Sequence, residues 1–292
     1  MDAPEGFEVD VNYKPKGGAL PLLDLLSTTT MGLAAMAPRG ANTKFTTLRY
    51  AVTTVELVLR GNLKDGDTQY RYRDVFFSVR HALCWMKVNG HYGEASFVTS
   101  YRRGDSLERV GFGQFRLFAN LQLGGNANVS INDTAASNGS GIVALAAQED
   151  EIKVSKFGFF DKEQPFPPFN VYMILINTVI KLSEENGEDW KDIIEAYVGS
   201  VDLSFRMEAT SVAARENLKV KYLLAAIEDL AGKLLTAPKE LQFRPFTFRI
   251  RRNGAFIGRG VFRRGRGVGD QFPQLENSTV SLDQEEGVVT EF

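Results

Sequence analysis

Three segments from the first half of this chain recur in the second half, in the same order and at nearly the same spacing. The matched pairs are residues 55–60 with 201–206 at an offset of 146, residues 97–103 with 246–252 at an offset of 149, and residues 110–115 with 257–262 at an offset of 147. An internal repeat decides the architecture before any single motif does. The 292 residues are therefore expected to form two tandem copies of one domain, each large enough to bury a core. This plan favours a building block whose copies pack together over a protein with one catalytic cleft.

Each copy combines strand patterns with helix patterns. Val55, Leu57 and Leu59 alternate as in a half-buried strand, and an apolar helical pattern follows an N-cap expected at Asp74. The second copy has a strong helical pattern over residues 215–235, a strand over 241–252, and a helix expected over 189–197. The sequence thus predicts an α+β fold, mostly β, made of two tandem, similar β-sandwich-like domains, each with a packed helix.

The two copies are expected to meet at a proline-rich junction. We place the first copy, with an N-terminal arm, at residues 1–160. The second copy, at residues 161–292, carries an arginine-rich segment and an acidic C-terminal tail.

Composition is that of a folded, soluble protein, with 43% apolar and 24% charged residues and a net charge of −2. The single cysteine, Cys84, lies in an apolar stretch that we expect to be buried, and its isolation fits a reducing compartment. No apolar run approaches the roughly 18 residues of a membrane span. An intracellular location is expected.

Motifs for catalysis, metals and cofactors are missing from the sequence. His81 and His91 have no cysteine or acidic partner at metal-ligand spacing, and the acids form no pair suited to acid–base chemistry. The two G-x-G fragments, at 111–113 and 258–260, are expected to be turn glycines with unusual φ rather than nucleotide loops. We expect no enzyme, no cofactor, no metal and no small-molecule substrate.

Charge is segregated near the C-terminus. Residues 244–269 contain arginines but no lysine or acid, whereas residues 270–292 contain acids but no basic residue. Arg102 and Arg103 end the matching segment of the first copy and are added to this group. The candidate anion-binding residues are therefore Arg244, Arg249, Arg251, Arg252, Arg259, Arg263, Arg264, Arg266, Arg102 and Arg103. Arginine suits phosphate because its guanidinium binds two phosphate oxygens at once. The expected ligand is RNA or anionic lipid headgroups, and the alternative is a solvated strand face without a ligand. If the acidic tail folds back onto the patch, it would mask the patch until a partner displaces it.

Two segments carry a resemblance to a known family. An aromatic strand leads into arginines and then glycine at residues 246–254, and residues 48–60 followed by 72–75 precede a helix with His81 and Trp85. With the duplicated plan, these resemble the matrix proteins of non-segmented negative-strand RNA viruses, of bornavirus, paramyxovirus and rhabdovirus type. The resemblance implies a non-enzymatic structural protein that self-associates, lies under a membrane and contacts a nucleocapsid. The near-neutral charge departs from the usually basic family, and residues 167–170 lack the tyrosine of a PPxY budding motif.

The preferred function is accordingly a viral matrix-type structural protein that self-assembles beneath a membrane and links it to the ribonucleoprotein. Its expected partners are further copies of itself, an anionic membrane surface, and RNA or a nucleoprotein. It would be found in the host cytoplasm, at the membrane periphery and in the virion, with the nucleus as an alternative. The competing function is another viral nucleic-acid-binding protein, such as a movement or coat protein.

Overall fold

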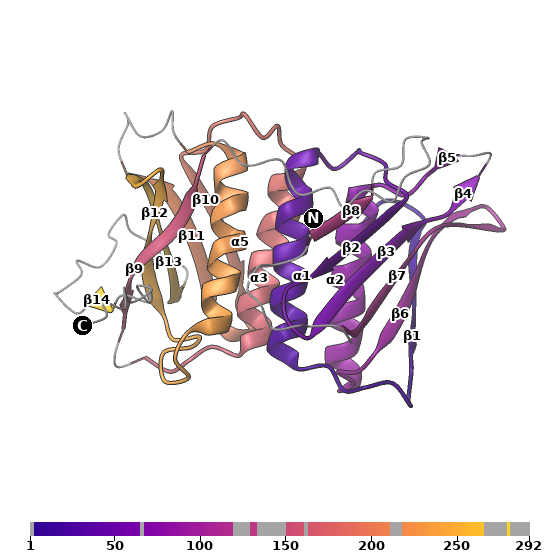
Figure 1. The fold of residues 1–292 in the computed structure, drawn as a ribbon, viewed down its shortest axis with the longest axis horizontal. Helices are drawn as coiled ribbons and strands as arrows, with labels where there is room; N and C mark the ends of the chain where they lie inside the picture. Colours follow the sequence, from indigo (N-terminus) through magenta and orange to yellow (C-terminus); the bar gives the residue numbers. More distant parts are fainter. Residues whose placement is uncertain are drawn as a thin grey trace, which may run out of the picture.

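The computed structural model describes residues 3–64, 67–118, 129–132, 150–160, 163–210, 218–265 and 279–280. Within these residues two six-stranded antiparallel sheets face each other, and the helices α1, α2, α3 and α5 fill the space between them (Figure 1). The first copy contributes β1 (Phe7–Tyr13), α1 (Leu22–Met36), η1 (Ala37–Arg39), β2 (Thr47–Ala51), β3 (Val55–Gly61), β4 (Leu63–Lys64), β5 (Asp67–Thr68), α2 (Tyr72–Asn89), β6 (Ala95–Arg103), β7 (Ser106–Leu117) and β8 (Val129–Asn132). The second contributes β9 (Ile152–Phe159), α3 (Pro168–Ser183), β10 (Ile193–Val198), η2 (Gly199–Val201), β11 (Leu203–Ala209), α5 (Val220–Thr236), β12 (Phe246–Arg252), β13 (Ala255–Arg264) and β14 (Thr279–Val280).

The same topology occurs twice. Each copy runs strand, helix, two strands, helix, two strands, and the sheet orders β1-β6-β7-β3-β2 and β9-β12-β13-β11-β10 match place for place. The tandem α+β fold class is confirmed. The structure adds a second helix to each copy, and the sandwich is formed by the two sheets with all four helices between them.

The division between copies lies earlier than predicted. β9 pairs with β12 in the second sheet, although it precedes residue 161. Strand pairing therefore assigns residues 152–159 to the second copy rather than to the first.

The helix predicted over residues 189–197 is wrong, because β10 occupies residues 193–198. Ile193 is 48% exposed, whereas its neighbour Ile194 is 3% exposed. This change of face at every residue is the period of a strand.

The repeat is real, and residues 110–115 match 257–262 as predicted, but the other two matched pairs are shifted by two residues. Phe97 pairs with Gly113 in the first sheet, and Phe248 pairs with Gly260 in the second. Phe248, and not Phe246, is thus the counterpart of Phe97. A shift of two residues keeps every side chain on its face of the sheet, so the hydrophobic pattern hides the error. For the same reason Leu203, and not Val201, matches Val55.

The G-x-G glycines are strand residues, which corrects their assignment to turns. None of these glycines has a positive φ. A Cβ on Gly113 would lie 2.0 Å from the Phe97 ring, and one on Gly260 would lie 2.0 Å from the Phe248 ring. Gly113 and Gly260 are needed because an aromatic ring from the neighbouring strand lies directly over each of these two positions.

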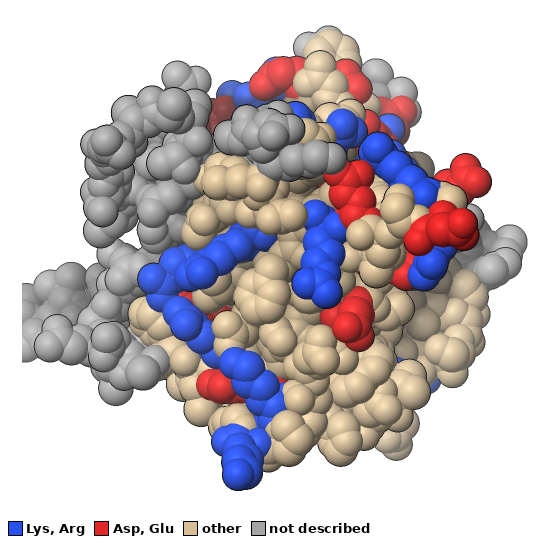
Figure 2. Space-filling view, turned by 90° about the vertical axis from the view of Figure 1, so that its right-hand side faces the viewer, with Lys and Arg blue, Asp and Glu red and all other residues tan. Residues whose placement is uncertain are grey.

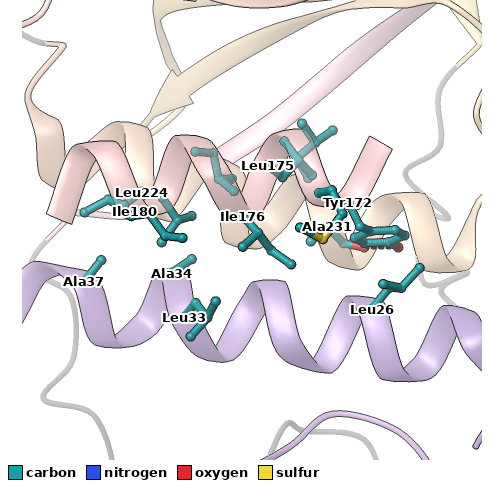
Figure 3. Close-up of a cluster of buried hydrophobic side chains, with 14 of the residues drawn as sticks. Leu26, Leu33, Ala34, Ala37, Tyr172, Leu175, Ile176, Ile180, Leu224 and Ala231 are labelled. Carbon is teal, nitrogen blue, oxygen red and sulfur yellow. Dashed lines mark hydrogen bonds between the residues drawn. The ribbon is translucent and has the colours of Figure 1, made fainter. Parts of the chain in front are cut away.

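The helices join the two copies into one core. α1 packs against α5 and α3, and side chains from all three helices interdigitate (Figure 3). Two hydroxyl groups are satisfied within this interface, since Ser27 Oγ and Tyr172 Oη donate to the Ala231 carbonyl at 3.3 and 3.2 Å. The copies therefore share a hydrophobic interior rather than touching through their surfaces.

Two expectations for α2 are corrected. Asp74 is not the N-cap but lies in the first turn, where its Oδ2 accepts from the Arg71 backbone N–H at 3.1 Å. Cys84 is exposed, because Leu83 and Met86 take the inward positions of the helix. Partial burial still raises the pKa of the Cys84 thiol.

Candidate interaction surfaces

Both sheets have one covered edge and one free edge in the part of the chain that the structure describes. β8 pairs with β2 at one edge of the first sheet, and β14 pairs with β9 at one edge of the second. The opposite edges, β1 and β10, have a neighbour on one side only. β2 and β10 are counterparts, so the same edge is covered in one copy and free in the other.

The two free edges lie on the same side of the molecule. α2 packs beside β1 and β6, α3 packs beside β10, and α2 contacts α3, with Lys87 Nζ 4.4 Å from the centre of the Phe169 ring. The covered edges lie on the other side, because α1 packs beside β2, α5 packs beside β9, and α1 packs on α5. We call the side formed by β1, α2, α3 and β10 the open side.

The β10 edge combines outward-pointing backbone groups with exposed apolar side chains. The Ala209 N–H donates to the Asp192 carbonyl at 3.0 Å. In an antiparallel pair, residues alternately point their backbone groups toward and away from the neighbouring strand, and Asp192 points toward β11. Ile193 and Tyr197 therefore direct their backbone groups away from β11. Ile193 is 48% exposed, Tyr197 36% and the nearby Trp190 57%. An edge of this kind is suited to pairing with another strand.

The predicted arginine segment lies on β12 and β13, and its members have different environments. Arg259 Nε binds Glu208 at 2.7 Å, as part of a network in which Arg206 binds Glu208 and Glu195. Arg252 binds Asp150 at 2.9 Å and stacks over a tyrosine ring, and Arg264 donates to the Gln164 carbonyl. These arginines are already engaged in structural contacts.

Three other arginines on these strands have no acidic partner among the described residues: Arg249, Arg251 and Arg263. Arg249 lies 5.2 Å from the centre of the Phe256 ring, and Arg251 Nε is buried without a hydrogen-bond partner. Arg249 and Arg263 lie on the outer face, because Phe248 and Phe262 next to them point into the core. Arg244 is half-buried and has a contact of its own. Arg266 lies outside the described residues, as does the acidic tail apart from β14.

The first-copy pair does not join this group. Arg102 Nε binds Glu8 at 2.5 Å across β6 and β1, and its hydrogen bond lowers the pKa of the Glu8 carboxyl. Arg103 is 3.6 Å from Glu108 and 78% exposed. The structure thus places the two copies' arginines on different sheets at opposite ends of the molecule.

The outer face of the first sheet holds charges that the sequence did not single out. Glu56 on β3 is 2% exposed, and it accepts from Arg49 Nη2 and Arg116 Nε, both at 2.6 Å. Figure 2 looks onto this face, where basic side chains cross a largely uncharged surface. Alternation along β3 was enough to place Glu56 on the face opposite Val55 and Leu57. Spacing along the chain did not show which strands lie beside β3, so the pairing with Arg49 and Arg116 was not predictable.

Comparison with known proteins gives no family for this chain. No family model matches it, and no curated protein matches it in sequence. A structural likeness is found to the tandem DUF26 ectodomain of the Arabidopsis thaliana cysteine-rich receptor-like protein PDLP8, with 10% identity and a TM-score of 0.25, covering 88% of this chain and 96% of that one. At that TM-score the likeness carries no argument about function.

Two negative observations apply to the described residues alone. They include no group of three histidine, cysteine or acidic side chains placed to hold a metal ion. None of their helices is both long enough and apolar enough to cross a bilayer.

Proposed function

We propose that this chain is a self-assembling structural protein of the viral matrix type, whose copies associate through the open side. The observation that carries the proposal is that, among the described residues, the sheet edges β1 and β10 lack a second neighbour and lie on one side, whereas the other two edges are covered. Membrane and ribonucleoprotein contact belong to the proposal through the family resemblance.

A second copy is the natural partner for this side. In the first copy, β8 pairs antiparallel with β2, the counterpart of β10. This edge of the repeat is therefore able to pair with an added strand. Two free edges on one side allow a copy related by two-fold symmetry to pair with both of them in a single contact. Pairing would give the outward backbone groups of Ile193 hydrogen-bond partners and would cover Trp190, Ile193 and Tyr197.

Sedimentation velocity at micromolar concentration tests the proposal. We expect the wild type to be a dimer or larger, and Ile193→Lys to weaken association at least tenfold by placing a charge on the edge. Leu107→Lys is the matched control, because Leu107 is 50% exposed against 48% for Ile193 but lies on β7 rather than at a free edge. A monomeric wild type that stays monomeric on anionic vesicles would refute the proposal.

The competing nucleic-acid-binding function is favoured by one observation, the three arginines without acidic partners on β12 and β13. If Arg249, Arg251 and Arg263 contact RNA phosphates, changing all three to Gln should weaken single-strand binding. The slope of log affinity against log salt should fall by roughly 0.7 for each phosphate that is no longer neutralised. Arg252→Gln is the control, since Arg252 is paired with Asp150. An unchanged slope in the triple variant would make these arginines a solvated face.

A further inference from the structure

A second concentration of arginines lies in a pocket at the start of α2, outside the arginine-rich segment. The pocket has a volume of about 280 Å³. It is lined by residues of α2, β6 and β7 and of the segments that precede β1 and α2. Its charged and hydroxyl-bearing members are Arg71, Arg73, Arg103, Asp74, Glu108 and Tyr101. These residues are brought together because β6 ends and β7 begins beside the first turn of α2.

Three arginines and two acids line the pocket, so the arginine charge is only partly compensated. Asp74 is 3% exposed, and its two oxygens accept from Tyr101 Oη at 2.6 Å and from the Arg71 N–H at 3.1 Å. Burial raises the pKa of the Asp74 carboxyl, so the protein surroundings disfavour its charge. Glu108 lies at 3.6 Å from Arg103, a loose pair at the exposed rim.

Arg73 is the least exposed of the three arginines, and its Nε is buried without a hydrogen-bond partner. An N–H donor without a partner is unfavourable in a buried position. On its other side Arg73 borders a hollow formed by residues 40–43 and 183–186, where Glu185 is already bound to Lys191 at 2.6 Å. Glu184, also in that hollow, is exposed.

The helix N-terminus itself is not available to a ligand. The Tyr72 N–H donates to the Thr43 carbonyl at 3.1 Å, and the Arg73 N–H donates to the Ala41 carbonyl at 2.9 Å. Binding would therefore depend on the guanidinium groups, whose planar arrays of N–H donors match the oxygens of a phosphate group.

We propose that this pocket binds a phosphate group, held by Arg73 at the inner wall and by Arg71 and Arg103 at the rim. The group comes either from a free phosphorylated molecule or from a lipid headgroup. The site is separate from the arginines of β12 and β13, and its occupation does not depend on self-association.

Calorimetric titration with inorganic phosphate, and flotation with phosphatidylcholine vesicles with and without phosphatidic acid, test the proposal on the full chain. Saturable binding is expected, and Arg73→Gln should weaken it roughly tenfold or more, since a charge-assisted hydrogen bond is removed. Arg80→Gln is the matched control, because Arg80 lies two turns along the same helix and outside the pocket.

The two arms separate the sources of the phosphate. Binding of inorganic phosphate alone identifies a free ligand, and binding to phosphatidic acid vesicles alone identifies a headgroup. If Arg73→Gln fails to fold, Arg103→Gln replaces it, since Arg103 is 78% exposed and should also weaken binding. The proposal is overturned if neither probe binds, if a folded Arg73→Gln binds as wild type does, or if Arg80→Gln weakens binding equally.

Discussion

Glu228 is an acid held at the boundary between the two copies. It lies on α5 in the second copy, and Tyr50 Oη of β2 in the first copy donates to its carboxylate at 3.3 Å. Burial, opposed by the hydrogen bond from Tyr50 and assisted by the neighbouring Asp229, raises the pKa of Glu228 to about 7. The same burial raises the pKa of Tyr50.

This residue should make the stability of the protein depend on pH. The folded state keeps the Glu228 proton up to about pH 7, whereas the unfolded chain releases it near pH 4.5. Its contribution is therefore complete below pH 4.5 and is lost as pH rises to about 7, by up to roughly 3 kcal/mol.

Glu228→Gln should remove that dependence, since the amide keeps a hydrogen-bond acceptor for Tyr50 without a charge. Urea unfolding at pH 4.5 and pH 8 measures it. The variant should match wild type at the lower pH and exceed it at the higher one. Equal free energies of unfolding for the two proteins at both pH values would show that burial does not raise the pKa of Glu228.

Sequence patterns predicted much at the residue scale, but not the ion pairs. Alternation at Val55, Leu57 and Leu59 correctly identified inward-facing residues, all of which are fully buried. The pairing of Arg259 with Glu208 joins residues 51 positions apart on neighbouring strands. Whether an arginine has an acidic partner depends on which strands are neighbours in the sheet. The distribution of charge along the sequence does not show that order.

At the scale of elements, the glycine–aromatic pairs are shared by both sheets. Phe97 over Gly113 and Phe248 over Gly260 have equal spacing, with the ring 2.0 Å from the position of a Cβ. Gly113→Ala and Gly260→Ala should each destabilise the protein by about 1–3 kcal/mol, because a packed ring must move. Thermal unfolding measures both effects.

Gly187→Ala is the control for these variants, because the nearest atom to its Cβ would be 3.7 Å away. It should be close to neutral. If the ring is the cause, Phe97→Leu combined with Gly113→Ala should cost less than the sum of the two single changes. Strict additivity would point instead to a backbone effect of alanine.

The repeat was detectable in the sequence because apolar alternation survives in both copies, and its register was not. A strand shifted by two residues keeps each side chain on the same face of the sheet. Residues 97–103 therefore resemble residues 246–252 in sequence, although the two strands do not correspond in that register in the sheets. The segment over 189–197 was assigned to the wrong element because an edge strand exposes apolar residues on its outer face, as Ile193 does. The open side could not be predicted either, since it depends on which edges β8 and β14 cover.

At the scale of the whole molecule, the two copies depend on each other. Leu26 and Leu33 of α1 are fully buried, and so are Ile176 of α3 and Ala231 of α5, which lie in the same cluster (Figure 3). Each buried aliphatic side chain contributes about 1.5–3 kcal/mol relative to an exposed one. A separated copy would expose one side of this cluster to water.

A protease site introduced within residues 133–149, which join the described parts of the two copies, tests this dependence. After cleavage we expect the two fragments to stay together and to keep the near-ultraviolet circular dichroism of the intact chain. Each fragment produced alone should aggregate or melt without cooperativity, because the apolar face of α1 is then separated from those of α3 and α5. Mixing the separately produced fragments should restore a one-to-one complex. A cooperative melt of either fragment alone would instead make the copies independent domains, and the helical layer would then be an interface between them rather than a shared core.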